Sequence, residues 1–324
     1  MNDLLLLSEK NMQQAAQMAD IIEAVRAAYK LYDKEQFQMD ARTHMSHNGN
    51  TLLLMPCYAD QLFGTKIVSV FPNNRSSPVT QGMMMLTDGD NGKTRALLNG
   101  TYLTGLRTGA LGGLAARYLA PADAHSIGLI GTGVQGFYQL LAICLERTIQ
   151  DIYLFNRTPE KAAAFSEKIK SQISPHINIH IKNRPHEIIS RSDIIVTATT
   201  SHIPALPNEP DLYNGKLVIG IGSFQPHMRE LPEELFKQTD HLFIDTLDAI
   251  QESGDVIDPL KNRWLTESQV IPFSSVAAGK VTPQLSMEKP MAFKSTGMAL
   301  FDVIAASVIY EKAVEQGIGL EVEL

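Results

Sequence analysis

The stretch that most constrains the fold of this chain runs from His125 to Gly136. Its first part, Ser126 to Ile130, is short and apolar, as expected for a buried strand. The next residues fit the pattern G-x-G-x-x-G, and a largely apolar helical segment follows from Phe137 to Glu146. A strand, a glycine turn and a helix in this order are typical of a dinucleotide-binding unit.

Each glycine of this turn has its own physical role. Gly131 allows the tight turn, Gly133 lets the backbone approach a pyrophosphate, and Gly136 lets the helix pack against the strand. The N-terminus of the helix presents free N–H groups and a partial positive charge to the phosphates. The alternative is a tight turn that binds nothing, and the flanking strand and helix favour the dinucleotide site.

The segment after the next predicted strand, Asp151–Phe155, bears on the choice of dinucleotide. Asn156 lies 25 residues after Gly131, where an NAD enzyme would carry an acidic ligand for the ribose. Here Arg157 and Thr158 follow instead of an acid. Because an arginine can bind a 2′-phosphate bidentately, we predict NADPH as cofactor, with NADH as the weaker alternative. The alternative is that Arg157 is a solvated residue that precedes a helix and does not bind the cofactor.

Composition narrows the class of protein. The 324 residues allow two domains, and a net charge of −7 argues against nucleic acid or an anionic membrane as partner. Cys57 and Cys144 lie far apart and form no C-x-x-C pair, which favours a reduced, cytoplasmic setting. No apolar run approaches the ~18 residues of a membrane-spanning helix. The histidines show no metal-binding spacing, so we predict no metal site.

The N-terminal part of the chain predicts an antiparallel sheet and two helices. A strand at Leu4–Leu7 precedes a helix at Asn11–Asp33 that Ser8 can cap, and a glycine-rich helix spans Leu103–Leu119 and ends at Pro121. The sheet is expected from two hairpins and one further strand, at Arg42–His47 with Thr51–Met55, Gln81–Thr87 with Lys93–Leu98, and Phe63–Phe71.

The central part of the chain predicts an α/β domain. Six strands separated by helices fit a doubly wound parallel sheet of the Rossmann type, at 126–130, 151–155, 177–181, 193–199, 216–222 and 241–245. A last amphipathic helix, Met298–Gln316, is expected to return to the first domain. We therefore predict an α/β fold with a Rossmann domain over 121–297 and a split α+β domain over 1–120 with 298–324.

Three cations of the first domain are candidates for an anion site. Lys66 lies within an apolar strand, where it needs a counter-charge or a solvated cleft. Arg42 opens the first hairpin and Arg107 begins the glycine-rich helix. If the three converge, they form a site for a substrate carboxylate; otherwise they are solvated surface groups. Asp302, on the last helix, either hydrogen-bonds near such a site or faces solvent.

Two blocks of sequence carry a family resemblance. Residues 63–72 (FGTKIVSVFP) and 99–110 (NGTYLTGLRTGA) resemble the ornithine cyclodeaminase/μ-crystallin family. Residues 115–120 (AARYLA), the glycine turn with Gln135, and residues 294–297 (KSTG) agree, so that the resemblance covers nearly the whole chain.

This resemblance implies a Rossmann domain beside a split, dimerising substrate domain, and hence a homodimer. It implies that Arg42, Lys66 and Arg107 bind the substrate carboxylate. The nicotinamide cofactor is expected at the matching residues, which are Thr80 (by a looser match), Thr108, Gly131, Gly133, Val134, Gln135, Asn156, Arg157, Thr158, Thr197, Ala198, Thr199, Gly222 and Ser295.

One departure from the family pattern bears on the chemistry. The cyclodeaminases of this family carry an aspartate after the fifth Rossmann strand, whereas this chain has Ser223 there. Cyclodeamination needs a carboxylate to hold and deprotonate an amine, and a serine without its own base does neither at neutral pH. Imine-reducing members often lack the aspartate, because the cofactor supplies the hydride and the protein anchors and orients the substrate.

The resemblance and this departure predict an NADPH-dependent reductase of a small cyclic 2-imino acid. The substrate would be 1-pyrroline-2-carboxylate, giving proline, or 1-piperideine-2-carboxylate, giving pipecolate. Lys66 would donate or relay a proton and Ser223 would line the reacting face. The alternatives are an ornithine cyclodeaminase, an alanine- or opine-type dehydrogenase, and a non-catalytic NADPH-binding protein of the crystallin kind.

Overall fold

The computed structural model describes residues 3–323, which separate into two compact units. The first comprises the residues up to Arg107 and those from Met298 onward, and the second comprises Thr108–Gly297. The division falls inside helix α3 (Gly100–Leu119), not at Pro121 as the sequence suggested. The reason is close packing, since a Cβ on Gly109 would lie 2.5 Å from Tyr138 O, which ties this half of α3 to helix α4 (Val134–Glu146).

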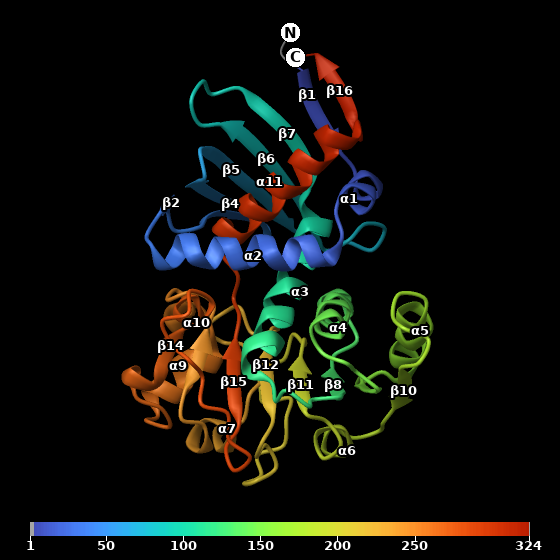
Figure 1. Cartoon of the computed structure of the whole chain (residues 1–324), viewed down its shortest axis with the longest axis vertical. Coiled ribbons are helices and arrows are strands. Elements are labelled where there is room, and N and C mark those ends of the chain that lie inside the picture. Colours follow the sequence, from blue (N-terminus) through green and yellow to red (C-terminus); the bar gives the residue numbers. More distant parts are fainter. Residues whose placement is uncertain (1–2, 324) are drawn as a thin grey trace. The chain divides into compact units, whose positions relative to one another are not determined.

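The first unit is an eight-stranded sheet with helices on one face (Figure 1). The strand order is β16-β1-β7-β6-β5-β4-β2, with β3 paired to β4, and the β1–β7 pair is parallel whereas the others are antiparallel. Both predicted hairpins are confirmed. The strands are β1 (Asp3–Leu7), β2 (Phe37–Met39), β3 (Thr43–His47), β4 (Asn50–Ala59), β5 (Leu62–Val70), β6 (Thr80–Asp88), β7 (Thr94–Asn99) and β16 (Leu320–Glu323).

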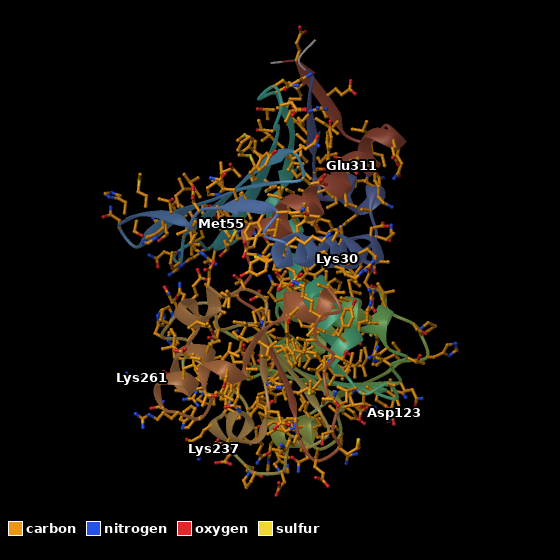
Figure 2. The ribbon with its side chains drawn as sticks, turned by 60° about the vertical axis from the view of Figure 1, so that its left-hand side comes forward. Lys30, Met55, Asp123, Lys237, Lys261 and Glu311 are labelled. Carbon is orange, nitrogen blue, oxygen red and sulfur yellow. The ribbon has the colours of Figure 1, made fainter. Side chains whose placement is uncertain are left out.

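Alternation along the strands gives this sheet one buried and one exposed face. Met55 on β4 is buried on the side of the helices, whereas its neighbour Leu54 is 40% exposed (Figure 2 labels Met55). The helices on the buried side are α1 (Glu9–Ala15), α2 (Met18–Asp33) and α11 (Ala299–Gln316). A Cβ on Gly64 of β5 would overlap Val303 of α11, so the last helix lies directly against the sheet.

The single helix predicted over Asn11–Asp33 is wrong, because α1 ends at Ala15 and α2 begins at Met18. Ser8 caps α1 as predicted, since its side chain accepts a hydrogen bond from Asn11 N–H. A second start signal lies within the predicted helix: the carboxylate of Asp20 accepts a hydrogen bond from Gln17 N–H at 2.9 Å. An acceptor at this position begins a new helix, and the chain is extended at Ala16.

The second unit contains an eight-stranded, wholly parallel sheet in the order β10-β9-β8-β11-β12-β15-β13-β14. The predicted doubly wound sheet is confirmed, and the six predicted strands are joined by two short ones, β14 and β15. The strands are β8 (Ser126–Ile130), β9 (Asp151–Phe155), β10 (Asn178–Ile181), β11 (Ile194–Thr197), β12 (Leu217–Gly220), β13 (Leu242–Ile244), β14 (Val270–Pro272) and β15 (Met291–Lys294).

Helices flank this parallel sheet (Figure 1). Besides α4, they are α5 (Pro159–Lys170), α6 (Pro185–Ile189), α7 (Glu233–Gln238), α8 (Ala249–Glu252), α9 (Gly254–Lys261) and α10 (Phe273–Ala277), with a 3₁₀ turn at Glu267–Gln269. Strand order reverses between β8 and β11, and ligands of such sheets bind beyond the carboxyl ends of the strands at this point. Within residues 3–323, no helix combines the length and apolar character needed to cross a membrane.

Candidate functional site

The glycine turn after β8 has the geometry that its pattern predicts. Gly131 has a φ of +99°, and a Cβ there would lie 2.5 Å from Ala198 O. A Cβ on Gly136 would lie 2.6 Å from Gly131 O, so that both positions require glycine. Around Gly133, in contrast, no atom lies within 4 Å of a Cβ built there. The turn therefore leaves open space at the N-terminus of α4.

The residues around this open space fit a dinucleotide. Gly133 is the N-cap of α4 and provides no side-chain cap, so the first N–H groups of the helix are free to bind an anion. Val134, the first residue of the helix, is 64% exposed. Among residues 3–323, Gln135 Oε1 and Thr197 Oγ1 are buried without a hydrogen-bond partner. Because buried polar atoms are normally paired, these two are candidates to bind a ligand at the strand switch point.

The residues predicted to bind the ribose lie beside the turn. Asn156 Nδ2 donates to Thr132 Oγ1 at 2.7 Å, and Asn156 Oδ1 accepts from Thr158 N–H at 2.9 Å. The amide of Asn156 therefore links the glycine turn to the start of α5. Arg157 is exposed beside it. Thr158 occupies the N-cap position of α5, as predicted, but its side chain makes no capping hydrogen bond.

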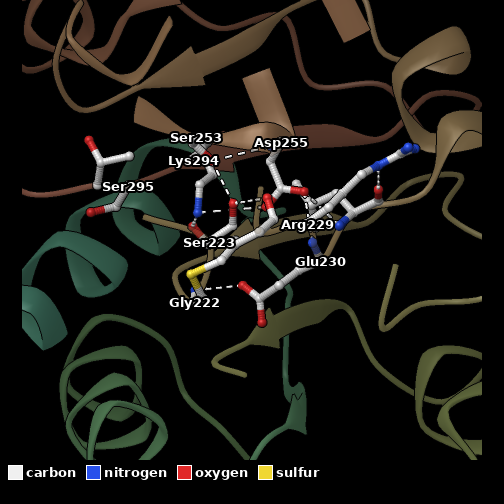
Figure 3. Close-up of polar contacts among 12 residues, drawn as sticks. Gly222, Ser223, Arg229, Glu230, Ser253, Asp255, Lys294 and Ser295 are labelled. Atoms are coloured by element: carbon white, nitrogen blue, oxygen red, sulfur yellow. Dashed lines mark hydrogen bonds and ion pairs between the residues drawn. The ribbon is translucent and has the colours of Figure 1, made fainter. Parts of the chain in front are cut away.

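Ser223 and Ser295 are buried and hydrogen-bonded within the second unit. Figure 3 shows the contacts of Ser223. Ser223 Oγ donates to Met228 O at 2.6 Å and lies 2.8 Å from Ser253 Oγ. Ser295 Oγ donates to Asp245 Oδ2 at 2.7 Å. These contacts occupy both hydroxyl groups with protein partners. A role for Ser223 at the reacting face and for Ser295 at the cofactor remains a prediction.

At two predicted cofactor contacts, Thr108 and Thr80, the structure shows no feature that points to a ligand. Thr108 is buried in α3, and its carbonyl oxygen accepts from Gln139 Nε2 of α4 at 2.6 Å. Thr80 begins β6, and its side chain is exposed. The packing therefore explains why Thr108 is held firmly, and it leaves the function of Thr80 a prediction.

The first unit brings two of the three candidate cations together on a carboxylate. Lys66 Nζ and Arg107 Nε each lie 3.0 Å from Oδ1 of Asp302. Lys66 comes from β5, Arg107 from α3 and Asp302 from the first turn of α11. All three are buried, with exposed fractions of 2%, 6% and 0%. Of the two alternatives predicted for Asp302, the structure shows the first: its side chain contacts the cations and does not face solvent.

The charges in this cluster do not balance. The two buried cations Lys66 and Arg107 share the single carboxylate of Asp302, so one positive charge among these three groups has no matching negative charge. Arg42, half-buried just before β3, adds positive charge that acts on Lys66. Burying two cations against one carboxylate is unfavourable, so Lys66 and Arg107 together favour binding of a further anion.

The pKa values of Lys66 and Asp302 are both shifted by the charges that surround them. Burial is the largest influence on Lys66 and lowers its pKa to about 8; Asp302 opposes this, whereas Arg107 and Arg42 add to it. Burial alone would raise the pKa of Asp302, but the charges and hydrogen bonds of Arg107 and Lys66 hold it below its ordinary value. At neutral pH the cluster therefore carries excess positive charge, and Lys66 can lose its proton at mildly alkaline pH.

Sequence reasoning missed two buried carboxylates of the second unit. Asp245, directly after β13, accepts hydrogen bonds from Ser295 Oγ and from the N–H groups of Thr296 and Gly297. Glu230 binds backbone groups after β11 and β12. For Asp245 the available signal was an acid directly after an apolar strand, where loops leave backbone N–H groups unpaired. Glu230, ten residues beyond the end of β12, carries no such signal.

The fold and the glycine turn are those of a nicotinamide-dependent oxidoreductase, and the other unit carries a buried cluster of two cations on one carboxylate. The chain belongs to the ornithine cyclodeaminase/mu-crystallin family, whose sequence profile matches residues 2–317. The family resemblance read from the motifs is thereby confirmed.

Individual relatives cover the whole chain. It is 33% identical over 328 residues to a Bacillus cereus protein named Delta(1)-pyrroline-2-carboxylate reductase, covering 99% of this chain and 100% of that one. The structure of Thermococcus litoralis Delta(1)-pyrroline-2-carboxylate reductase in complex with NADH and L-proline is similar, with a TM-score of 0.92, 30% identity and coverage of 98% and 100%. An archaeal alanine dehydrogenase dimer with bound NAD has a TM-score of 0.91, 27% identity and coverage of 99% of both chains.

A pair of glycine variants tests the turn. Gly133→Ala should change the free energy of unfolding by less than about 0.5 kcal/mol, since a Cβ there meets no neighbour. It should nevertheless weaken dinucleotide binding, because the methyl group occupies space that a pyrophosphate needs. Gly136→Ala should lose about 1–3 kcal/mol of stability, because its Cβ would approach Gly131 O. Denaturant unfolding and fluorescence titration with NADPH measure the two effects; unchanged affinity in Gly133→Ala would contradict the assignment.

Proposed function

We propose that this protein reduces a small cyclic 2-imino acid with NADPH, converting 1-pyrroline-2-carboxylate to proline or its six-membered homologue to pipecolate. The observation that carries this proposal is the buried cluster in which Lys66 and Arg107 share Asp302, so that two cations face one carboxylate. One substrate carboxylate supplies the missing negative charge. The relatives named Delta(1)-pyrroline-2-carboxylate reductase support this choice of substrate.

In this proposal each residue of the cluster has a defined task. Lys66, Arg107 and Arg42 hold the carboxylate, and each charged hydrogen bond contributes about 1.5–3 kcal/mol. A bound nicotinamide cofactor supplies a hydride to the imine carbon. The imine nitrogen must carry a proton for that carbon to accept the hydride. Lys66, with a pKa of about 8, is suited to donate or relay this proton near neutral pH.

The surroundings of Ser223 favour reduction over cyclodeamination. The hydroxyl donates to the carbonyl oxygen of Met228, and its other close partner is the Ser253 hydroxyl. Neither partner is a base that would activate the serine toward an amine. This supports the interpretation that the chain lacks the group that the cyclodeaminases of the family use.

Turnover by the purified protein tests the proposed reaction. NADPH oxidation is followed with 1-pyrroline-2-carboxylate and with 1-piperideine-2-carboxylate, and ammonia release is followed with ornithine and NAD⁺. Pyruvate with ammonia and NADH tests for an alanine dehydrogenase. Steady imine-dependent oxidation is expected. Faster turnover of ornithine or pyruvate would contradict the proposal, and bound NADPH without any turnover would indicate a binding protein.

The pKa of Lys66 predicts how activity depends on pH. The ratio kcat/KM for the imine should fall as pH rises through about 8, because Lys66 loses its charge and its proton. Lys66→Met should lower kcat/KM by about 10²–10⁴-fold and remove this limb. Asp302→Asn should move the limb to lower pH, because the charge of Asp302 raises the pKa of Lys66.

Since the imine nitrogen also titrates, the control is the binding of cyclopentanecarboxylate, a ligand whose ring carries no nitrogen. Its affinity should fall over the same pH range in the wild type and over a lower range in Asp302→Asn. An identical pH profile in the two proteins would argue against the assigned role of Lys66.

The proposed preference for NADPH rests on Arg157, which is exposed beside the amide of Asn156, and on the missing acid. Arg157→Ala should raise the KM for NADPH about tenfold, which corresponds to roughly one charged hydrogen bond, and leave the KM for NADH nearly unchanged. Lys170→Ala, at the far end of α5, is the matched control for loss of a positive charge. Equal KM values for NADPH in wild type and Arg157→Ala would refute this part of the proposal.

The exposed face of the first sheet supports a homodimer. Met45, Leu54, Phe63 and Met83 come from four consecutive strands and are 73%, 40%, 52% and 40% exposed. Strand register places Leu54 opposite Ile67, and Ile67 opposite Met83, on one surface. Large exposed apolar patches mark association sites, and the archaeal neighbour was determined as a dimer.

Sedimentation equilibrium should therefore give the mass of two chains, and Leu54→Asp should give the mass of one. Lys30→Asp, an exposed position on α2, is the control for added negative charge. A wild-type mass of one chain would contradict the proposed dimer.

A further inference from the structure

The carboxylate of Glu230 joins two loops of the second unit, and Figure 3 shows its contact with one of them, at Gly222. Its side chain is fully buried. Oε1 accepts from Thr199 N–H at 2.6 Å and from Thr199 Oγ1 at 2.7 Å, and Oε2 accepts from Gly222 N–H at 2.5 Å. Thr199 follows β11 and Gly222 follows β12. One carboxylate thus connects the carboxyl ends of two adjacent strands, of which β11 borders the strand switch point.

The two loops are in direct contact. A Cβ on Gly222 would overlap Thr199 O and would also lie 2.7 Å from Glu230 Oε1. Only glycine therefore fits where the loop after β12 passes the loop after β11. Thr197 Oγ1, buried without a partner among residues 3–323, lies two residues before Thr199. The junction is closely packed and includes a buried polar atom that has no hydrogen-bond partner in the described residues.

The backbone of Glu230 is itself held in place by a second buried carboxylate, that of Asp255. Asp255 Oδ1 accepts from the N–H groups of Glu230 and Leu231, at 2.8 and 2.9 Å. Asp255 Oδ2 lies 3.7 Å from Lys294 Nζ, which donates to Gly220 O at 3.2 Å. Asp255 and Lys294 are fully buried, as Glu230 is. Through Asp255 and Lys294, the backbone of Glu230 and Leu231 is therefore linked to β12 and β15. Glu230 thus has little freedom to move away from the two loops.

We propose that Glu230 is a positioning residue for the nicotinamide cofactor, acting through the backbone of Thr199 and Gly222 without touching the cofactor. The inference rests on the proposed use of a nicotinamide cofactor by this unit. It adds a function for a residue that neither the glycine motif nor the charged cluster of the first unit includes. Glu230 holds the two loops in the conformation that receives the cofactor.

A carboxylate is needed at this position because both oxygens accept hydrogen bonds from N–H groups. A glutamine provides one oxygen acceptor and one NH₂ donor. In either amide orientation, NH₂ faces the N–H of Thr199 or the N–H of Gly222, and one loop loses its hydrogen bond. Glu230→Gln therefore keeps the size of the side chain and removes the connection between the loops. Glu230→Asp keeps the charge but is too short to reach both loops.

The experiment compares Glu230→Gln with Glu234→Gln, a partly exposed position on α7 that pairs with Lys237. Fluorescence titration with NADPH and with NADH, in the absence of an imine, measures cofactor affinity. The dissociation constant should rise about tenfold in Glu230→Gln and stay unchanged in Glu234→Gln. With saturating cofactor, kcat should change by less than about threefold, since the cofactor KM carries the effect. Thermal unfolding without cofactor verifies that each variant is folded.

A double-mutant cycle tests whether Glu230 acts through Thr199. Thr199→Val removes the hydroxyl donor, and its effect on the dissociation constant should not add to that of Glu230→Gln. If Glu230→Gln fails to fold, Glu230→Asp takes its place in every comparison. A folded variant that binds both cofactors as tightly as wild type overturns the proposal, and so does full additivity.

These outcomes are separate from those that test the proposed reaction. A wild-type protein that binds NADPH but reduces no imine refutes the reaction, and the titrations of Glu230→Gln still decide the role of Glu230. A wild-type protein that binds neither NADPH nor NADH overturns the role of Glu230 as well.

Discussion

The chemistry of the first unit depends on one carboxylate, that of Asp302, which faces two buried cations. An isolated lysine within a sheet would lose its proton or draw in water. Asp302 keeps Lys66 charged at neutral pH and fixes the guanidinium of Arg107 at 3.0 Å. It does so without neutralising the cluster, so the site stays attractive to an anion. A second acid at this place would balance the charge and remove the attraction for the carboxylate of the proposed substrate.

The second unit uses buried acids differently, to bind backbone N–H groups of loops. Parallel strands end in irregular turns, and their N–H groups need partners that the sheet does not provide. Glu230 supplies these after β11 and β12, and Asp245 supplies them for Thr296 and Gly297, just after β15. An ionised carboxylate accepts several hydrogen bonds at once, which neutral side chains do less well. The turns at the carboxyl edge of the sheet are thereby held without further secondary structure.

The elements that the sequence predicted well are those whose signal is local. The glycine turn needs only consecutive residues, and the hairpin between β3 and β4 follows from the Asn48-Gly49-Asn50 turn. Strands β14 and β15 were missed; β14 ends in a proline and β15 in a lysine, residues that are unusual at the end of a buried strand. The boundary at Pro121 was misplaced because α3 runs without a break through the division between the units.

The pairing of Lys66 with Asp302 could not be predicted from the sequence, for a different reason. Lys66 and Asp302 are 236 residues apart, and only the return of the last helix to the first sheet brings them together. The spacing of residues on α11 shows which side of the helix Asp302 occupies relative to its neighbours, but not which strand that side meets. For Ser223 the position in the chain was informative, whereas the direction of its hydroxyl depends on Met228 and on the distant Ser253.

The uncompensated charge also couples substrate binding to proton uptake. Lys66 has a pKa of about 8 in the protein without substrate, held down by burial and by Arg107 and Arg42. A bound carboxylate adds negative charge beside it and must raise that pKa. By thermodynamic linkage, the same interaction makes carboxylate binding draw a proton onto Lys66 wherever the lysine is partly neutral. In the proposed reaction, which consumes one proton for each hydride, the substrate itself therefore charges the residue that is placed to donate the proton.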